Sequence, residues 1–334
     1  MIRNLVLCAD IGGTNTRLAV LKLKDGLSKL EVLEYRELKT AKIKDIYDEL
    51  NRFIENYRAK KGDTIRQLSL AVAGPVDKER AKMTNGRLTI SIKKLKAKTP
   101  IKKALLLNDF CAFAWGINSL SEKDFFVINK GISIKHATKA VIGAGTGLGK
   151  AILYYNPLLK QYIPLASEGG HADFPGDTEE EFELQEFVKK QYKAGFPVVY
   201  EDLVSGKGLE RIYEFLSNKH FSKKSALPAP QISATIKDNR CSRETFLMFT
   251  RFYARCCRNF ALETLALGGV YIGGGIAQAN QALISKNFMR EFTLNKTYQS
   301  MLKKIPVYIV INKHTSLYGA ALAYKNSEIK QIIK

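Results

Sequence analysis

The sequence predicts an α/β protein built from two domains. Stretches with the apolar pattern of strands alternate with stretches of helical periodicity, an order that is typical of layered α/β folds. A strand, a glycine-rich loop and a second strand occur twice, within residues 5–23 and again within 140–154. The length of 334 residues is enough for two hydrophobic cores of ordinary size. We therefore expect two α/β domains, the second of which repeats the opening hairpin of the first.

The first elements form a hairpin around a glycine loop. Residues 5–9 are an apolar run, 10–15 interrupt it with two glycines, and 17–23 resume the strand pattern. Apolar residues then recur at helical spacing over 43–57, which predicts a helix, and 68–73 is a further apolar strand. The N-terminal region is thus predicted to contain two strands, a helix and a third strand.

A polar pair stands at the end of the next predicted strand. Residues 104–107 are a short apolar strand, Asn108 and Asp109 follow it, and 110–120 continue as a predicted helix. The pair Asn85-Gly86 marks a tight turn before this strand. Binding sites of α/β proteins collect at the carboxyl ends of strands, so Asn108 and Asp109 are candidate site residues.

A second strand, loop and strand follow in the middle of the chain. Residues 140–142 and 151–154 are apolar strands that enclose the loop 143–149. Gly145-Thr146 of this loop can be superposed on Gly13-Thr14 of the first, which indicates a weak internal duplication.

The later elements continue the alternation of strands and helices. Asp177 and Thr178 predict a helix N-cap, so we interpret the three glutamates that follow as helix electrostatics rather than a site. The remaining predicted elements are a long helix over 246–267, a strand over 270–272 that meets Gly273-Gly274-Gly275, a strand over 307–311 and a final helix through 318–320.

Composition narrows the class of protein. Hydrophobic residues make up 46% and charged residues 25%, the proportions of an ordinary soluble globular protein. The five cysteines form no Cys-x-x-Cys pair, which argues against a disulfide framework or a thiolate zinc site and fits the reduced cytoplasm. No apolar run reaches the length of a membrane span, and the opening run is too short for a signal peptide. We expect a cytoplasmic protein without a membrane partner.

The net charge of +21 raises nucleic acid or an anionic small molecule as a partner. Lysines are concentrated at 93–98 and 219–224, but the aromatic residues that stack on bases are sparse in both stretches. A solvated surface is therefore the simpler interpretation of these stretches. We expect no specific nucleic-acid partner, and we expect the charge to help attract a small anion.

The glycine-rich loops are candidates for phosphate binding, because glycines let backbone N–H groups approach an anion closely. Neither loop fits a common nucleotide fingerprint. The first lacks the Gly-x-x-x-x-Gly-Lys-Ser/Thr spacing, and Leu148 stands where the third glycine of a dinucleotide motif belongs. Each loop also leads into a strand, whereas those two sites need a helix that starts at the phosphate. Phosphate binding of another kind is expected.

Four segments, in order along nearly the whole chain, carry these loops and the strand-end pair. They are residues 7–17, 107–110, 143–149 and 268–276. They resemble the first phosphate motif, the catalytic segment, the second phosphate motif and the adenosine motif of the sugar kinases with an actin-like, ribonuclease-H-like fold. The segment Asn108-Asp109-Phe110 resembles the bacterial glucokinases in particular. Further similar segments are 73–75, 83–85, 167–174 and 201–206.

This resemblance implies a two-domain α/β fold of the actin-like type with a cleft between the domains. Residues 1–108 together with about 312–334 are expected to form a small domain with the first phosphate loop. Residues 109–311 are expected to form a large domain with the second phosphate loop, the sugar-binding residues and the adenosine motif. The resemblance also implies a homodimer.

The same resemblance implies an ATP-dependent glucokinase of glycolysis that phosphorylates the 6-hydroxyl of D-glucose. Asp109 is then the general base that takes the proton of this hydroxyl as it attacks the γ-phosphorus. The alternative for Asp109 is a helix cap, and the alternative for His171 is a structural histidine. The residues expected to bind the sugar are Asn85, Asn108, Asp109, Glu168, His171 and Glu201.

ATP is expected at the three glycine loops. Asp10 is expected to hold Mg²⁺ through water, because Mg²⁺ keeps much of its hydration shell, and its alternative role is to start a turn. The residues expected to bind the nucleotide are Asp10, Ile11, Gly12, Gly13, Thr14, Asn15, Gly145, Thr146, Gly147, Gly273, Gly274 and Gly275.

The chain departs from the related patterns in three places. Zinc-containing relatives carry a cysteine cluster shortly after their Glu-x-x-His, whereas here no cysteine lies between His171 and Cys241, so no structural zinc is expected. Arg258 stands where a small residue is usual, and 312–314 stand where an acidic residue is common. Both changes leave details of the adenosine pocket open.

Two other functions stay open. The shape of the pocket at the 2-position of the sugar is not visible in the sequence, so a kinase for another hexose or an N-acetylhexosamine fits as well. A sugar-responsive regulator on the same scaffold needs an appended DNA-binding module, and only nine residues precede Asp10.

Overall fold

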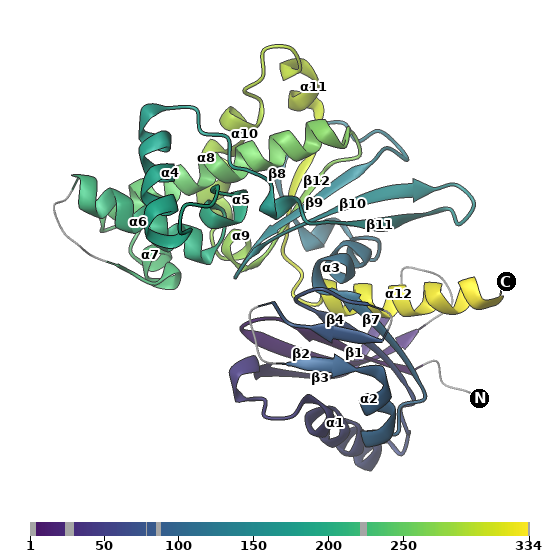
Figure 1. The fold of residues 1–334 in the computed structure, drawn as a ribbon. Coiled ribbons are helices and arrows are strands. Elements are labelled where there is room, and N and C mark those ends of the chain that lie inside the picture. The colour runs from purple at the N-terminus through teal and green to yellow at the C-terminus, as the bar shows by residue number, and fades with distance from the viewer. Residues whose placement is uncertain (1–4, 24–29, 78, 85–87, 221–225, 333–334) are drawn as a thin grey trace. The chain divides into compact units, whose positions relative to one another are not determined.

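The computed structural model describes residues 5–23, 30–77, 79–84, 88–220 and 226–332 (Figure 1). The chain divides into two compact units. The first comprises Met1–Asp124, Asn156–Ala166 and Asn312–Lys334, and the second comprises Phe125–Tyr155 and Ser167–Ile311. The first unit thus extends beyond residue 108, where we expected it to end, because helix α3 (Asp109–Ile117) packs against the C-terminal helix α12 (Thr315–Ile332).

Two glycines bring α3 and α12 into close contact. A Cβ on Gly116 would collide with the carbonyl oxygen of Thr315, and a Cβ on Gly319 would collide with that of Ala112. Only glycine allows the two helix backbones to approach this closely.

The first unit is built on a five-stranded sheet of order β3-β2-β1-β4-β7. The strand β1 pairs antiparallel with β2 and parallel with β4, and β4 pairs parallel with β7. The hairpin predicted around the first glycine loop is therefore confirmed. The strands are β1 (Leu5–Ile11), β2 (Asn15–Leu23), β3 (Leu30–Lys39), β4 (Gln67–Val72) and β7 (Lys103–Asn108).

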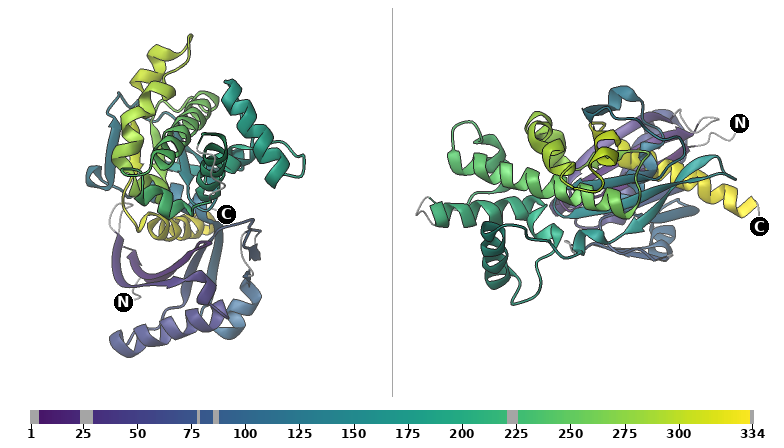
Figure 2. Two further views of the ribbon diagram at one scale, coloured as in Figure 1. Left: turned by 90° about the vertical axis from the view of Figure 1, so that its left-hand side faces the viewer. Right: turned by 90° about the horizontal axis from the view of Figure 1, so that it is seen from above.

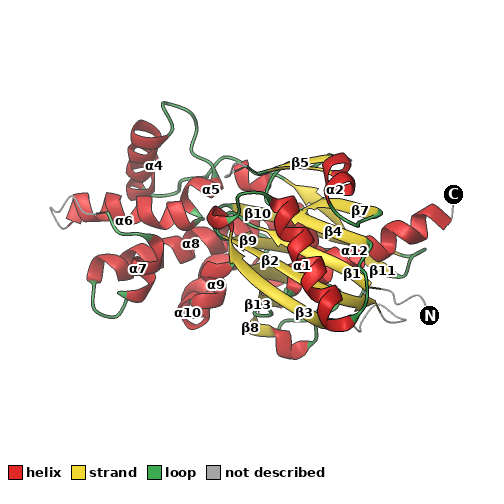
Figure 3. Cartoon of the chain, turned by 90° about the horizontal axis from the view of Figure 1, so that it is seen from below, coloured by secondary structure: helices red, strands yellow, loops and turns green. Residues whose placement is uncertain are grey.

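Every residue of β1 is buried, because helices cover both faces of this sheet. Successive side chains of a strand point to opposite faces. Leu7 packs in the core with the helices α1 (Ile46–Lys61) and α2 (Ile92–Lys98), whereas Cys8 packs in the core with α12. Figure 3 shows α1 lying across the strands.

The second unit holds a sheet in which five strands follow the order β10-β9-β12-β13-β8. The strands β9, β12 and β13 run parallel, while β10 is antiparallel to β9 and β8 is antiparallel to β13. These strands are β8 (Phe125–Asn129), β9 (Lys139–Ala144), β10 (Leu148–Asn156), β12 (Val270–Gly273) and β13 (Val307–Val310). The strand β11 (Gln161–Ser167) belongs to the first unit except for its last residue.

Helices pack around α8 in this unit, and α8 confirms the long helix predicted there. It contacts α6, α7 and α10 (Figures 1 and 2). The helices are α4 (Glu179–Tyr192), α5 (Tyr200–Leu203), α6 (Gly206–His220), α7 (Ala229–Ala234), α8 (Arg240–Glu263), α9 (Gly275–Ala279), α10 (Gln281–Phe292) and α11 (Gln299–Lys304).

The start of α4 confirms the predicted N-cap and acidic first turn. The Thr178 side chain caps the helix by accepting a hydrogen bond from the Glu181 backbone N–H. Glu181 itself is fully buried, and its Oε2 lies 2.6 Å from Nη1 of Arg255 on α8. Glu181 lies in the first turn of α4, as the sequence predicts, and its carboxylate in addition forms a buried ion pair.

The sequence pattern missed β3 because it lies at an edge of its sheet. None of its residues is buried, and charged residues are interspersed with the apolar ones. Such a strand shows neither a continuous apolar run nor a strict alternation. Within the described residues, no helix combines the length and the apolar character that a membrane span needs.

Candidate active site

The first glycine loop joins β1 to β2 and is closed by a residue that follows β3. The Gly12 N–H donates to the carbonyl of Asn15 at 3.0 Å. The Thr40 hydroxyl donates to the carbonyl of Gly12 at 2.7 Å, and the Thr40 N–H donates to that of Thr14 at 3.0 Å. Lys39 Nζ donates to Asn15 Oδ1 at 2.9 Å. These bonds hold a tight turn made of residues that we expected to bind phosphate.

Asp10 lies at the end of β1, directly before this loop. It is buried, and its Oδ2 lies 3.4 Å from Nη1 of Arg17 on β2. Burial raises the pKa of the Asp10 carboxyl above its usual value, and the charge of Arg17 only partly opposes this rise. The fold therefore holds a carboxylate at a place where ionisation is costly, which is a frequent property of functional sites.

We expect Asp10→Asn to raise the free energy of unfolding at pH 8 and to lower ATP-dependent activity. The raised pKa means that the native state favours the protonated form, so ionisation costs stability as the pH rises through the folded pKa. Asparagine cannot ionise, so the variant avoids this loss of stability. The difference in free energy of unfolding between variant and wild type should therefore vanish below the usual carboxyl pKa of 3.8. Urea unfolding of the variant and the wild type at pH 8 and near pH 3.5 measures this difference in the free energy of unfolding. An equal difference at both pH values would contradict the prediction.

Asn108 and Asp109 lie at the end of β7, on the same sheet edge as Asp10. The parallel register pairs Ile11 with Val72 and Val72 with Asn108, so the three strands end together. Asn108 Oδ1 accepts from the N–H groups of Phe110 and Cys111 at 2.9 and 3.1 Å. Asn108 is thus the N-cap of α3, and Asp109 is its first residue. The alternative role of Asp109 as the cap is therefore wrong.

The second glycine loop joins β9 to β10 and contacts Glu201 of α5. Within the loop, the Gly145 N–H donates to the carbonyl of Gly147 at 2.8 Å. The Leu148 N–H donates to Glu201 Oε2 at 2.8 Å. The Gly206 N–H donates to the carbonyl of Gly145 at 2.8 Å. The structure thus joins an expected sugar ligand to the expected phosphate loop.

Glu168 and His171 lie beside the same loop. The His171 N–H donates to the Glu168 carbonyl at 2.9 Å, and this short turn brings Gly170 against Leu148 so closely that a Cβ on Gly170 would collide with the Leu148 carbonyl oxygen. The Tyr200 N–H also donates to the carbonyl of Ala172 at 3.0 Å. The side chains of Glu168 and His171 are exposed and available to a ligand.

Gly274, which directly follows β12, lies against the start of the second loop. Gly274 has φ +89°, and a Cβ on it would collide with the carbonyl oxygen of Ala144. Tyr253 of α8 joins the same two strand ends. Its hydroxyl accepts from the Ala144 N–H at 3.1 Å and lies 3.3 Å from the Gly273 carbonyl.

The sequence did not indicate that Tyr253 belongs to this region, because Tyr253 fits the pattern of apolar positions along a long helix. The available signal was its hydroxyl, because a buried tyrosine needs a hydrogen-bond partner.

Two other residues named from the sequence lie elsewhere. Asn85 lies outside the described residues. Arg258 hydrogen-bonds to the end of α10: its Nη1 donates to the carbonyls of Glu291 and Leu294 at 3.1 and 2.9 Å.

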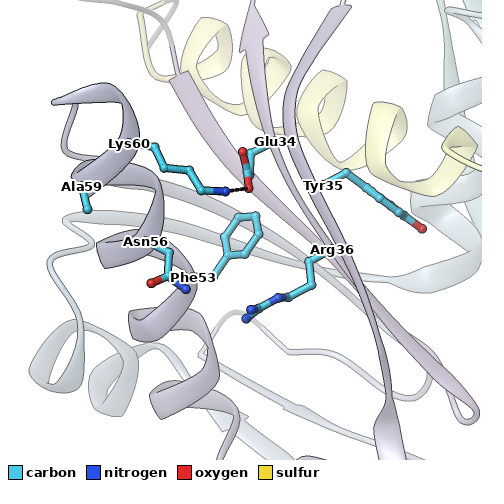
Figure 4. Close-up of a pocket in the computed structure, with 7 residues that line it drawn as sticks. All are labelled: Glu34, Tyr35, Arg36, Phe53, Asn56, Ala59 and Lys60. Carbon is cyan, nitrogen blue, oxygen red and sulfur yellow. Dashed lines mark hydrogen bonds and ion pairs between the residues drawn. The ribbon is translucent and has the colours of Figure 1, made fainter.

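A small surface pocket of the first unit lies apart from the expected site residues. Figure 4 shows it between β3 and α1, with the Lys60 ammonium 2.8 Å from Glu34 Oε1. Phe53 forms its floor. None of the residues expected to bind sugar or nucleotide lines this pocket.

We expect Gly147→Ala to weaken sugar binding by moving Glu201. A Cβ at residue 147 would lie 2.5 Å from Glu201 Oε2, so the carboxylate must shift and lose its bond from the Leu148 N–H. Loss of one charge-assisted bond predicts about a tenfold rise in the KM for glucose.

Gly145→Ala is the matched control for Gly147→Ala, because a Cβ there meets nothing within 4 Å. It should leave the KM for glucose unchanged. Steady-state kinetics on both variants make the comparison, and an equal KM for the two variants would refute the role of the Glu201 contact.

Solved structures resemble this chain over nearly its whole length. A glucokinase from an Antarctic psychrotroph superposes with a TM-score of 0.82 at 26% identity, covering 97% of this chain and 99% of that one. A glucokinase from Balamuthia mandrillaris in complex with glucose superposes with a TM-score of 0.78 at 22% identity, covering 97% and 94%. The fold and the two glycine-loop hairpins define a sugar kinase of the actin-like α/β class.

The sequence comparisons lead from this class to one family. The Glucokinase family model matches residues 7–327. Glucokinases of Trichormus variabilis and Neisseria gonorrhoeae are each 32% identical to the chain, over 345 and 324 residues. These alignments cover 95% and 96% of this chain and 98% and 94% of the relatives. The chain belongs to the glucokinase family.

Proposed function

We propose that this protein transfers the γ-phosphoryl group of ATP to the 6-hydroxyl of D-glucose. Membership of the glucokinase family supports the reaction. In the structure, the observation that carries the proposal is the hydrogen bond from the Leu148 N–H to Glu201 Oε2, because it joins a proposed sugar-binding carboxylate to a proposed phosphate loop.

Asp109 is the proposed general base. It takes the proton of the 6-hydroxyl while the bond from that oxygen to the γ-phosphorus forms and the bond to the bridging oxygen breaks, which releases ADP. Its place at the carboxyl end of β7, in the first turn of α3, suits a residue that must meet a ligand at the sheet edge.

The sugar hydroxyls are proposed to bind Asn108, Glu168, His171 and Glu201, with Asn85 as a further ligand. Asn108 uses Oδ1 as the helix cap, and its Nδ2 donates to the Gly74 carbonyl at 3.3 Å. The amide nitrogen therefore keeps one N–H for a sugar hydroxyl. Glu201 uses Oε2 for the loop, and its Oε1 is proposed to accept from the sugar.

Nucleotide binding is proposed for the glycine loops, with the phosphates at 11–15 and 145–147 and the nucleoside at 273–275. Mg²⁺ is proposed to bind Asp10 through water, and a buried carboxylate beside the first loop fits a hard cation. A bound Mg²⁺ would neutralise charge on the transferred phosphoryl group.

The test is an ATP-consumption assay across glucose, mannose, fructose and N-acetylglucosamine with the purified protein. Glucose should give the highest kcat/KM, and no consumption should occur without sugar. A higher kcat/KM with mannose or N-acetylglucosamine than with glucose would identify that sugar as the preferred substrate. Consumption that is independent of sugar would overturn the kinase assignment.

We also propose a cytoplasmic homodimer that acts in glycolysis. The resemblance to bacterial glucokinases supports this arrangement. Light scattering coupled to size-exclusion chromatography tests it, and a monomeric mass at assay concentration would refute the dimer.

A further inference from the structure

The second unit contains a buried lysine directly after the second glycine loop. Lys150 lies on β10, two residues beyond Leu148, and only 3% of its surface is exposed. Buried lysines are rare, and those that occur are generally paired with an acid. No carboxylate of the described residues forms an ion pair with Lys150.

Two aromatic rings lie beside the ammonium, where a buried lysine usually has a carboxylate. Lys150 Nζ lies 4.8 Å from the ring centroid of Tyr200 on α5 and 5.1 Å from that of Phe260 on α8. Cys256 on α8 lies close to the same ammonium: burial raises the pKa of its thiol to about 11, and the charge of Lys150 partly opposes this rise. A desolvated cation over aromatic faces is held strongly and in a defined place.

The stem of the same side chain lies against the other expected sugar segment. A Cβ on Gly169 would lie 3.0 Å from Lys150 Cδ and 3.5 Å from its Nζ. Gly169 directly follows Glu168, and Tyr200 directly precedes Glu201. One buried side chain therefore contacts the chain neighbours of two proposed sugar ligands that are far apart in sequence.

We infer that Lys150 is a positioning residue of the sugar site, which holds the segments of Glu168 and Glu201 at the spacing that glucose requires. This inference rests on the proposed sugar-binding roles of those two residues. We do not expect Lys150 to touch the substrate, because its side chain is buried and its ammonium lies over the rings of Tyr200 and Phe260. Its effect should thus fall on glucose affinity rather than on the chemical step.

Lys139 supplies a matched control within the same sheet. It lies on β9, and its Nζ is 5.2 Å from the ring centroid of Tyr271. In the antiparallel ladder Lys139 pairs with Leu153, which places it at the end of β9 remote from the glycine loop. It shares the cation-over-ring contact with Lys150 but not the contact with the sugar segments.

The experiment compares Lys150→Met, Lys150→Arg and Lys139→Met with the wild type. We expect Lys150→Met to raise the KM for glucose about tenfold, with kcat and the KM for ATP changed less than about twofold, because the cation–π contacts with Tyr200 and Phe260 are lost. Lys150→Arg keeps the cation and should restore most of the affinity. Lys139→Met should leave the KM for glucose unchanged. Calorimetric titration with glucose provides a readout that does not depend on catalysis.

The outcomes separate this inference from the proposed function. If the wild type phosphorylates glucose and Lys150→Met shifts the KM for glucose no more than Lys139→Met does, the positioning role is overturned while the kinase assignment stands. If the wild type neither binds nor phosphorylates a hexose, both fail. Should Lys150→Met not fold, Phe260→Leu removes one of the two ring faces and must raise the KM for glucose by a smaller factor for the inference to hold.

Discussion

Asp109→Asn is expected to lower kcat about a thousandfold, the scale of a general base that is removed from its proton transfer. Asparagine matches the size of the carboxylate and can still accept from the Phe110 N–H, which lies 2.9 Å from Asp109 Oδ1. The helix α3 should therefore stay intact, and the KM for glucose should change little. Steady-state kinetics with saturating ATP and glucose measure the effect, and Asp109→Ala should lower kcat at least as far.

The control for Asp109→Asn is Asp45→Asn, a second aspartate at a helix start of the same unit. Asp45 is the N-cap of α1, its side chain accepts from the Tyr47 N–H at 2.8 Å, and asparagine caps a helix equally well. This control should retain wild-type kcat. Near-normal turnover of Asp109→Asn and Asp109→Ala would sink the assignment of the base.

Gly274→Ala is expected to destabilise the second unit by about 3 kcal/mol and to raise the KM for ATP. Gly274 combines φ +89° with a backbone that lies against the Ala144 carbonyl, so a side chain meets both backbone strain and a collision. Because the colliding atom is backbone, the start of the second loop has to move. Thermal unfolding with and without ATP measures both effects.

Gly275→Ala is the control for stability, since a Cβ there meets nothing within 4 Å and the residue starts the helix α9. Alanine favours a helix more than glycine does, so the melting temperature of Gly275→Ala should equal or exceed that of the wild type. If both variants melted at the same temperature, the close approach of Gly274 to Ala144 would not matter in solution.

Much of the fold was predictable because it follows from short-range patterns. The apolar run of β1, the glycines after it and the resumed strand β2 predict a hairpin from adjacent residues alone, and the helical spacing of α1 does the same. The strand β3 was not predictable in this way, because an exposed edge strand carries its charges among its apolar residues.

The candidate site was also predictable only in part. The identity of Asp109, Glu168, His171 and Glu201 as ligands came from motifs, and their roles stay proposals. Their contacts were not visible in the sequence. Thr40 closes a loop that ends 25 residues before it, and nothing near Lys150 in the chain marks it as a buried cation.

By itself, the sequence determined the glycine loops and the strands and helices with a clear apolar periodicity, because these depend on residues a few positions apart. Only the tertiary structure decided which distant groups the loops meet. Glu201 accepts a hydrogen bond from Leu148, Gly274 approaches Ala144, and Lys150 contacts both segments that are proposed to bind sugar, because the sheet order and the helix packing bring them together. Such contacts depend on the arrangement of whole elements, which no local pattern encodes.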